Sequence, residues 1–166
     1  QKDDANSEAI YSSCEKYRYS LTRVWNKEAK KLHFVMLNPS TATEIQNDPT
    51  VERCERRARN LNFGSFRVTN IFAWRETDPK KMKCATEPIG LMNDEAIIRG
   101  CNWGDCTIAA WGNHGIYLNR GFDVMELLGK CDKPIFHLGI SKTGQPKHPL
   151  YLSYEILPKI WLNNDT

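Results

Sequence analysis

The chain has 166 residues, of which 40% are hydrophobic and 26% are charged, and its formal net charge is +3. These values are typical of an ordinary globular protein. They exclude a membrane-spanning class, because no apolar run approaches the roughly 20 residues that a spanning helix needs. The small positive charge allows a nucleic-acid partner without requiring one.

Six cysteines are scattered along the chain without a Cys-x-x-Cys pair. We interpret them as reduced thiols of a cytoplasmic protein. Cys101 and Cys106 with His114 match no standard spacing of metal ligands, so we expect neither a metal nor another cofactor. We expect residues 1–15 to be a flexible tail and residues 16–162 to be a single, monomeric α/β domain.

The first predicted elements are two strands. Residues 16–25 alternate aromatic or apolar with polar side chains, which predicts an edge strand. Residues 32–37 are an apolar run of strand length, and a turn at 26–27 precedes them. The two strands are expected to pair as an N-terminal hairpin, or the first to stand alone at the edge.

A helix is predicted after a polar loop at 38–48. Asp48 is in the N-cap position and Pro49 in the first helical position, and apolar residues then recur at helical spacing up to Leu61. Four arginines lie largely off that apolar face, at 53, 56, 57 and 59. They are interpreted either as a solvated surface or as a patch that contacts phosphates.

The remaining elements alternate between strands and helices. Strands are predicted at 66–74, 106–111 and 134–138, and helices at 91–99, 121–130 and 150–162, the last interrupted by Pro158. Asn70 interrupts the apolar run of its strand. A buried amide needs hydrogen-bond partners, so Asn70 either braces a loop or recognises a ligand.

This alternation predicts a three-layer α/β/α fold around a central, mainly parallel, four-stranded sheet. In such sheets ligands bind beyond the carboxyl ends of the strands. Four loops are expected to meet at that edge. They carry Asn38 with Ser40 and Thr41, then Asn70, then Asn113 with His114, and finally His148.

The pooled side chains are amides, hydroxyls and imidazoles. Phosphate-loop and dinucleotide-binding patterns are absent, and so is the Gly-x-Ser-x-Gly pattern of serine hydrolases. A fixed amide can recognise the edge of a base or hold a water, and an imidazole can stabilise an anionic leaving group. This combination favours cleavage of an N-glycosidic bond.

Four short segments resemble motifs of the uracil-DNA glycosylase superfamily, in the order of that superfamily. Leu-Asn-Pro-Ser at 37–40 is similar to its first motif, and Val-Thr-Asn at 68–70 to its base-recognition strand. Ala-Trp-Gly-Asn-His at 110–114 is similar to a Leu-Trp-Gly stretch, and Lys-His-Pro at 147–149 to its His-Pro-Ser-Pro motif. In this chain Leu150-Tyr151 replaces the Ser-Pro of the last motif.

Most of the chain resembles more closely a family of uncharacterised bacterial and phage proteins. The shared patterns are Met-Leu-Asn-Pro-Ser-Thr-Ala, Asp-Pro-Thr, Asn-Ile-Phe-Ala-Trp-Arg, Ala-Trp-Gly and His-Pro-Leu-Tyr. This second resemblance implies no activity of its own.

The glycosylase resemblance implies a role for each matching residue. Asn38 would orient the attacking water, Asn70 would read the base, and His148 would stabilise the departing base anion. Asp48 would polarise the water, although a helix cap is the stronger interpretation. The other substrate-binding candidates are Ser40, Thr41, Phe72, Trp74, Trp111, Asn113, His114 and Tyr151. Packing in the core is the stronger interpretation of Phe72, Trp74 and Trp111, and the alternative interpretation of Tyr151. The candidates for contact with the DNA backbone are Arg53, Arg56, Arg57, Lys142 and Lys147.

Three functional hypotheses follow. The first is a DNA glycosylase that hydrolyses the bond to a flipped uracil or modified base, with DNA as the partner. The second is an enzyme of the same fold that processes a free nucleoside or nucleotide. The third is a nucleic-acid-binding module without catalysis.

Overall fold

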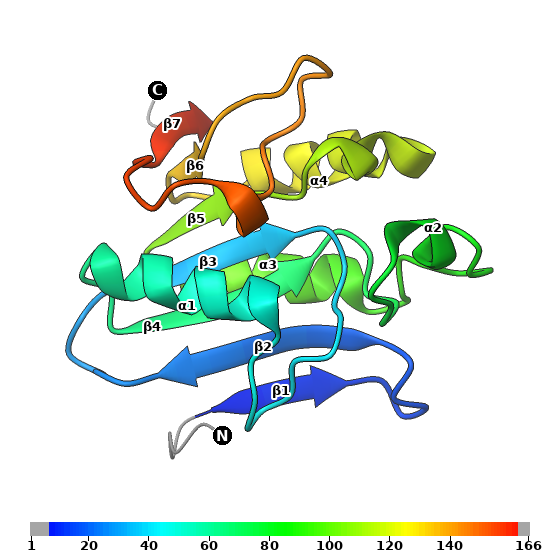
Figure 1. Ribbon diagram of the computed structural model, residues 1–166, viewed down its shortest axis with the longest axis horizontal. Helices are drawn as coiled ribbons and strands as arrows, with labels where there is room; N and C mark the ends of the chain where they lie inside the picture. The colour runs from blue at the N-terminus through cyan, green and yellow to red at the C-terminus, as the bar shows by residue number, and fades with distance from the viewer. Residues whose placement is uncertain (1–6, 163–166) are drawn as a thin grey trace.

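Seven β-strands form one sheet in the computed structural model, which describes residues 7–162 (Figure 1). The order of the strands across the sheet is β1-β2-β4-β3-β5-β6-β7. Their bounds are β1 Glu8–Tyr11, β2 Arg18–Val24, β3 Lys31–Met36, β4 Ser65–Asn70, β5 Cys106–Ala109, β6 Ile135–His137 and β7 Lys159–Leu162.

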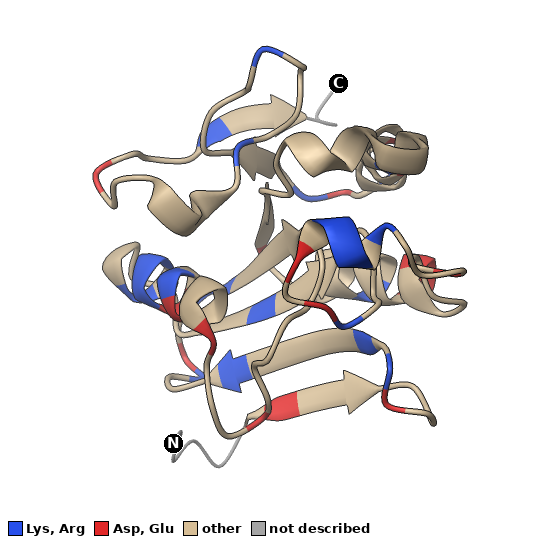
Figure 2. Cartoon of the chain, turned by 45° about the vertical axis from the view of Figure 1, so that its right-hand side comes forward, with Lys and Arg blue, Asp and Glu red and all other residues tan. Residues whose placement is uncertain are grey.

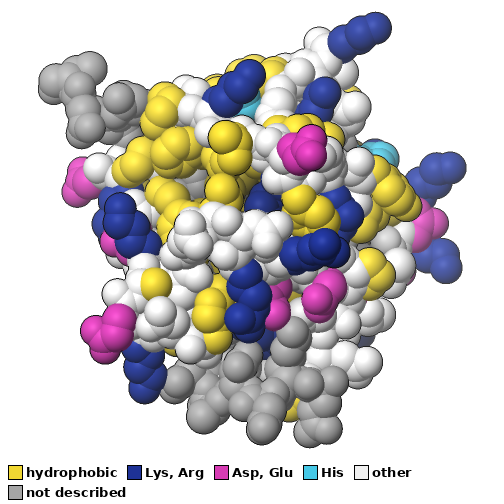
Figure 3. Space-filling model, turned by 60° about the vertical axis from the view of Figure 1, so that its left-hand side comes forward, with side chains coloured by type: hydrophobic (Ala, Val, Ile, Leu, Met, Phe, Trp, Pro, Cys, Tyr) yellow, Lys and Arg dark blue, Asp and Glu magenta, His cyan; other side chains and the backbone are white. Residues whose placement is uncertain are grey.

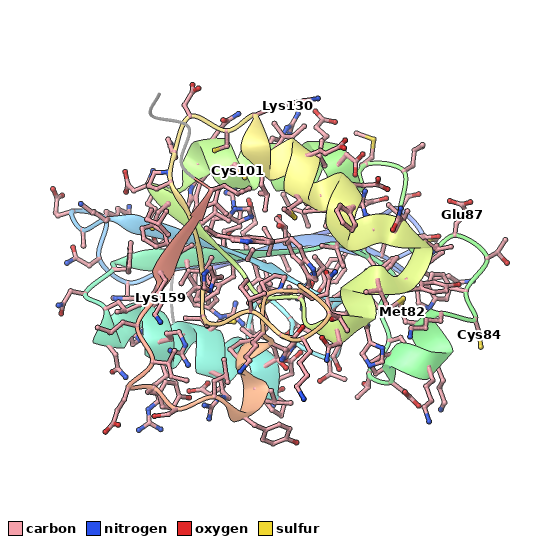
Figure 4. All side chains as sticks on the ribbon, turned by 90° about the horizontal axis from the view of Figure 1, so that it is seen from above. Met82, Cys84, Glu87, Cys101, Lys130 and Lys159 are labelled. Carbon is pink, nitrogen blue, oxygen red and sulfur yellow. The ribbon has the colours of Figure 1, made fainter. Side chains whose placement is uncertain are left out.

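Helices cover both faces of this sheet. Their bounds are α1 Pro49–Asn60, α2 Pro79–Met82, α3 Asn93–Trp103 and α4 Arg120–Gly129, with 3-10 turns η1 Asn113–Asn119 and η2 Pro149–Tyr151. From above, α3 and α4 lie on one side of the sheet, and α1 with η2 on the other (Figure 4). The predicted α/β class is confirmed. Within residues 7–162, none of the helices has both the length and the apolar character needed to cross a membrane.

The core has two halves, one on each face. Phe34 and Met36 of β3 pack with Cys54 of α1, whereas Val35 packs with Ile97 of α3. Successive strand residues point to opposite faces, so β3 contributes to both halves. This explains why its sequence reads as a continuous apolar run rather than an alternating one.

The predicted size and strand direction of the sheet need correction. Neighbouring strands β4–β3, β3–β5 and β5–β6 are parallel, while β1–β2, β2–β4 and β6–β7 are antiparallel. The sheet is therefore seven-stranded and mixed, rather than four-stranded and mainly parallel. The outermost strands, β1 and β7, have only four residues each, which is too short for a clear alternating pattern.

The predicted N-terminal hairpin is also wrong. Strand β2 is not at the edge, and it pairs with β1 and β4 instead of β3. Its residues are nearly all buried, including Arg18 and Arg23, so the alternation in its sequence does not mark an exposed face. Strand β1 lies within the predicted flexible tail, and residues 1–6 of that tail lie outside the described residues.

The predicted last helix at 150–162 is replaced by η2 and the antiparallel strand β7. Pro158 stands just before β7 and cannot donate the hydrogen bond that a helix would require. The other predicted helices and strands are confirmed, with shifted ends. Helix α1 begins at Pro49 after the Asp48 cap, and β4 ends at Asn70 rather than at residue 74.

A buried histidine joins the three central strands. The ring of His33 in β3 lies between the hydroxyls of Thr107 in β5 and Thr69 in β4, at 3.0 and 2.8 Å. Complete burial lowers the pKa of His33 to about 3, so the ring is neutral. Gly100 of α3 packs against this ring, and a Cβ there would come within 2.3 Å of His33 Nε2.

Candidate functional site at the carboxyl edge of the sheet

The four loops named from the sequence meet at one edge of the sheet. Because β3, β4, β5 and β6 run in the same direction, their carboxyl ends lie on the same side. Backbone hydrogen bonds join the loops there: Ile71 N–H donates to Met36 O, Ala110 N–H to Val35 O, and Gly112 N–H to Pro146 O.

Asn38 follows β3 and is fixed by the loop after β4. Its Nδ2 donates to the carbonyl of Glu76 at 2.5 Å and to that of Pro39 at 3.3 Å. These bonds orient the amide and leave Oδ1 without a partner among the described residues. A fixed acceptor of this kind is what positioning of a water molecule requires.

Asp48 is a helix cap. Its Oδ1 accepts from Val51 N–H at 2.8 Å and its Oδ2 from Ala42 N–H at 3.2 Å. The side chain is buried and each oxygen accepts a backbone N–H, so this carboxylate holds the start of α1 and the loop before it. The geometry supports the helix-cap interpretation over the catalytic one.

Two buried arginines of β2 hold the loop between Asn38 and α1. Arg23 donates to the carbonyls of Thr43, Glu44 and Gln46 and to Asn47 Oδ1, at 2.6 to 3.2 Å. Arg18 donates to Ala42 O at 3.0 Å, and burial lowers its pKa to about 10. Sequence reasoning missed both residues. The available signal was a charged side chain inside a strand pattern, which must find a partner if the strand is internal.

Asn70 is the last residue of β4 and is almost fully buried. Alternate residues of a strand point to the same face of the sheet, so Asn70 lies on the face of Phe66 and Val68. These two residues belong to the core beneath α1, and Asn70 therefore faces α1. Neither Nδ2 nor Oδ1 of Asn70 has a hydrogen-bond partner among the described residues. A buried amide without partners is an unusual and unfavourable arrangement in a folded protein.

The backbone at Asn70 is, in contrast, firmly held. Asn93 of α3 donates to Asn70 O at 2.7 Å and to Ile71 O at 3.2 Å. Buried Arg120 of α4 also donates to Ile71 O, at 2.7 Å, and pairs with Asp94. These residues, also missed from the sequence, fix the strand end without engaging the side chain of Asn70.

His148 closes the same face. Its Nδ1 accepts from Leu150 N–H at 3.2 Å, which places the ring hydrogen on Nε2. Burial is the main cause that lowers the pKa of His148 to about 4; Asp48 acts against this shift, and nearby His114 contributes to it. Arg53 of α1 donates to Pro149 O at 3.0 Å, which holds this loop against the helix. His148 is therefore a neutral hydrogen-bond donor at neutral pH.

Asn113 and His114 follow β5 and are both exposed. Thr143 Oγ1 donates to Asn113 Oδ1 at 2.7 Å, which links this loop to the one after β6. His114 Nδ1 lies 2.9 Å from Lys83 Nζ. Burial and then Lys83 lower the pKa of His114.

The structure favours the core interpretation for two of the aromatic candidates. Phe72 and Trp111 are core side chains, and Trp111 Nε1 donates to buried Gln145 at 2.8 Å, so neither ring is open to a base. Trp74 is partly buried against Tyr17, with ring centroids 5.4 Å apart. Tyr151 is 93% exposed and packs in no core.

Ser40 and Thr41 line a depression of about 550 Å³ beside Asn38. Trp74, Arg75, Glu76 and Thr77 are among its other lining residues. Ser40 and Thr77 share a hydrogen bond of 2.8 Å between their hydroxyls. Three predicted substrate-binding residues, at 40, 41 and 74, therefore share one hollow.

The arginines of α1 do not form a free phosphate-binding patch. Arg57 is buried and donates to the carbonyls of Ile156 and Ser153, and Arg53 donates to those of Pro149 and Leu152. Arg56 remains exposed, with its guanidinium over the ring of Tyr154. Figure 3 shows basic side chains separated by apolar and acidic ones on that side of the molecule. Lys142 and Lys147 are exposed, as a phosphate contact would require.

Residues 18–150 match the family described as "Protein of unknown function (DUF1643)". The chain belongs to this family. The matched segment runs from β2 into η2, so it contains all four loops of the edge and leaves out β1 and β7. No curated protein and no solved structure matches the chain.

Proposed function

We propose that this member of the DUF1643 family hydrolyses the N-glycosidic bond of a nucleotide whose base is flipped into the carboxyl edge of the sheet. The observation that carries the proposal is the buried, unpartnered amide of Asn70. Uracil and thymine offer an N–H beside a carbonyl, and one amide side chain complements that pair. Base binding would supply the two hydrogen bonds that Asn70 lacks, and because Asn70 is almost fully buried, the loops of this edge have to open for a base to reach it.

His148 supports the chemical step. Its neutral ring presents Nε2–H, and a donor aimed at a carbonyl oxygen of the base stabilises the negative charge that develops there as the bond breaks. A group with a pKa of about 4 is a weak proton acceptor at neutral pH, which favours this electrostatic role over proton transfer.

Asn38 supplies the other half of the mechanism. The C1′–N bond breaks with its electron pair passing to the base, and a water held by Asn38 Oδ1 adds to C1′ of the sugar. The water loses its proton to solvent, and the departing base anion takes up a proton from solvent. No carboxylate base is invoked, in keeping with the role of Asp48 as a helix cap.

The motif resemblance adds support, because the four segments similar to uracil-DNA glycosylases all fall at this edge. The proposed fold relationship is to that superfamily. Uracil or a modified base is the expected target.

A free nucleotide is the second candidate substrate. It is favoured by the internal use of Arg53 and Arg57. The exposed arginines of α1 are then Arg56, which lies over the ring of Tyr154, and Arg59, which pairs with Glu55. Fewer phosphate contacts mean weaker binding of a polynucleotide and a smaller dependence on salt.

The test is release of a base. The protein is incubated in excess with single- and double-stranded oligodeoxynucleotides that carry uracil, mismatched thymine or hypermodified pyrimidines, followed by alkali, and with the corresponding nucleotides. Strand scission supports the glycosylase, and base release from nucleotides alone supports the second candidate. If no substrate loses its base, catalysis is refuted and a binding module remains.

His137→Gln is a matched control for His148→Gln. His137 Nδ1 also accepts a backbone N–H two residues ahead, from Gly139 at 2.9 Å, but its ring packs near Trp161 on the other face of the sheet. Loss of one transition-state donor is expected to lower the rate about 100- to 1,000-fold in His148→Gln and to leave His137→Gln nearly unchanged. Equal rates in the two variants would exclude the role of His148.

A further inference from the structure

A basic cluster next to the site is not used by the mechanism above. It consists of Lys80, Lys81 and Lys83, on and just after α2. In Figure 2 this short helix faces the viewer as a basic segment, with acidic residues in the loop before it. Its position is fixed by Met82, which is fully buried and is labelled beside α2 in Figure 4.

Lys83 is held at both ends. Its carbonyl accepts from the hydroxyl of Tyr117 at 2.9 Å, and its ammonium lies 5.5 Å from the centre of the Tyr117 ring. The same ammonium donates to His114 Nδ1 at 2.9 Å. A lysine side chain is usually mobile, so these contacts remove much of the entropy that a ligand would otherwise have to overcome.

Asp78, the cap of α2, is near enough to His114 to raise its pKa, but among residues 7–162 it forms no ion pair with these lysines. Within residues 7–162, none of the three lysines forms an ion pair with a carboxylate. Lys83 donates to an imidazole instead, which leaves His114 neutral with its hydrogen on Nε2. Lys83 is half-buried and His114 is exposed, so two donors, one of them charged, lie side by side, as a group with several anionic oxygens requires.

The cluster borders the proposed site. The loop that leads into α2 binds Asn38 through Glu76 O and Ser40 through Thr77. His114 is close enough to His148 to lower its pKa. The lysines thus lie at the same edge as Asn38, on the part of the edge formed by α2 and η1 rather than by α1.

We propose that Lys83 and His114 bind a phosphate of the nucleotide strand whose base enters the site, with Lys80 and Lys81 contributing charge. This inference rests on the proposed function. The phosphate backbone is then contacted by the segment 80–83 and η1, rather than by the arginines of α1, two of which bond to backbone carbonyls of the protein itself.

The experiment compares Lys83→Gln with Lys27→Gln. Lys27 is exposed in the turn between β2 and β3, at the opposite end of β3, so its variant loses the same charge away from the site. Binding of a labelled single-stranded oligodeoxynucleotide of mixed sequence is measured by fluorescence anisotropy at several salt concentrations.

Lys83→Gln is expected to weaken binding about tenfold, as one charged phosphate contact would, while Lys27→Gln stays close to the parent protein. The slope of log K against log salt should fall by about 0.7 in Lys83→Gln, the value for one phosphate on a single strand. A purely structural role would change affinity without changing this slope. His114→Gln, which removes the ring that fixes Lys83, should weaken binding as well.

Equal affinities and slopes for the variants at 83 and 27 would overturn the inference. The base-release assay separates this failure from that of the proposed function. Base release with unchanged binding in Lys83→Gln refutes only the phosphate site. Binding that depends on Lys83 without release of any base refutes only the catalysis.

Discussion

Replacement of Asn70 by leucine tests whether its buried amide is reserved for a ligand. Leucine has the same number of side-chain heavy atoms and the same branching, so the change removes polarity with little change in size. In the free protein, Nδ2 and Oδ1 are buried without partners. An unsatisfied buried polar group costs about 1–3 kcal/mol, so its removal should stabilise the protein by a similar amount. Part of this stabilisation is lost because the branch of leucine is tetrahedral, whereas that of asparagine is planar, and it packs less well in the same space.

Asn70→Leu is therefore expected to stabilise the protein by about 1–2 kcal/mol, which corresponds to a rise in Tm of roughly 2–8 °C for a chain of this size. The same variant should lose base release. The measurement is urea denaturation followed by tryptophan fluorescence, together with the base-release assay.

Asn93→Leu is the matched control. Its Nδ2 donates to the carbonyls of Asn70 and Ile71, whereas its Oδ1 is buried without a partner. The leucine variant loses two hydrogen bonds and removes one unsatisfied acceptor, so stability should fall by about 1 kcal/mol. Opposite signs for the two asparagines are expected. If Asn70→Leu is less stable than the parent protein, the amide has partners in solution, and the argument for a base-binding site at Asn70 fails.

Three further predictions test the scaffold. Gly100→Ala should destabilise the protein by about 1–3 kcal/mol because its Cβ would come within 2.3 Å of His33, whereas Gly129→Ala, with open space around it, should stabilise it by roughly 0.5 kcal/mol in thermal melts. A change in stability of the same sign in both variants would contradict the packing at His33. Arg23→Met should lower the free energy of unfolding in urea by on the order of 3 kcal/mol because several loop carbonyls lose their donor, whereas exposed Arg99→Met should change it by less than about 1 kcal/mol. Similar unfolding midpoints for the two variants would refute the role of Arg23 in holding the loop. His148 has a pKa near 6.5 in the unfolded chain and about 4 in the folded protein, so its contribution to stability should be complete above pH 6.5 and fall as the pH drops towards 4. Over this range the free energy of unfolding of His148→Gln should fall by about 3 kcal/mol less than that of the parent protein. The same pH profile in both proteins would refute the buried neutral ring.

The sequence determined the elements whose signals are local. The start of α1 was readable because Asp48 and Pro49 satisfy the requirements of a helix end within a few residues. The order of strands and helices placed Asn38, Asn70, Asn113 and His148 after strand ends, and the parallel pairing of β4, β3, β5 and β6 brings those ends to one edge.

The tertiary structure alone decided which charged side chains are available to a ligand. Helical spacing shows that Arg53 and Arg57 lie off the apolar face of α1, but not that the segment 149–156 covers them. In the same way, the pattern of β2 does not show that β1 and β4 flank it and bury Arg18 and Arg23. Partners distant in sequence leave no local pattern, so the satisfied arginines, the unsatisfied Asn70 and the neutral His148 could be recognised only once the chain was folded.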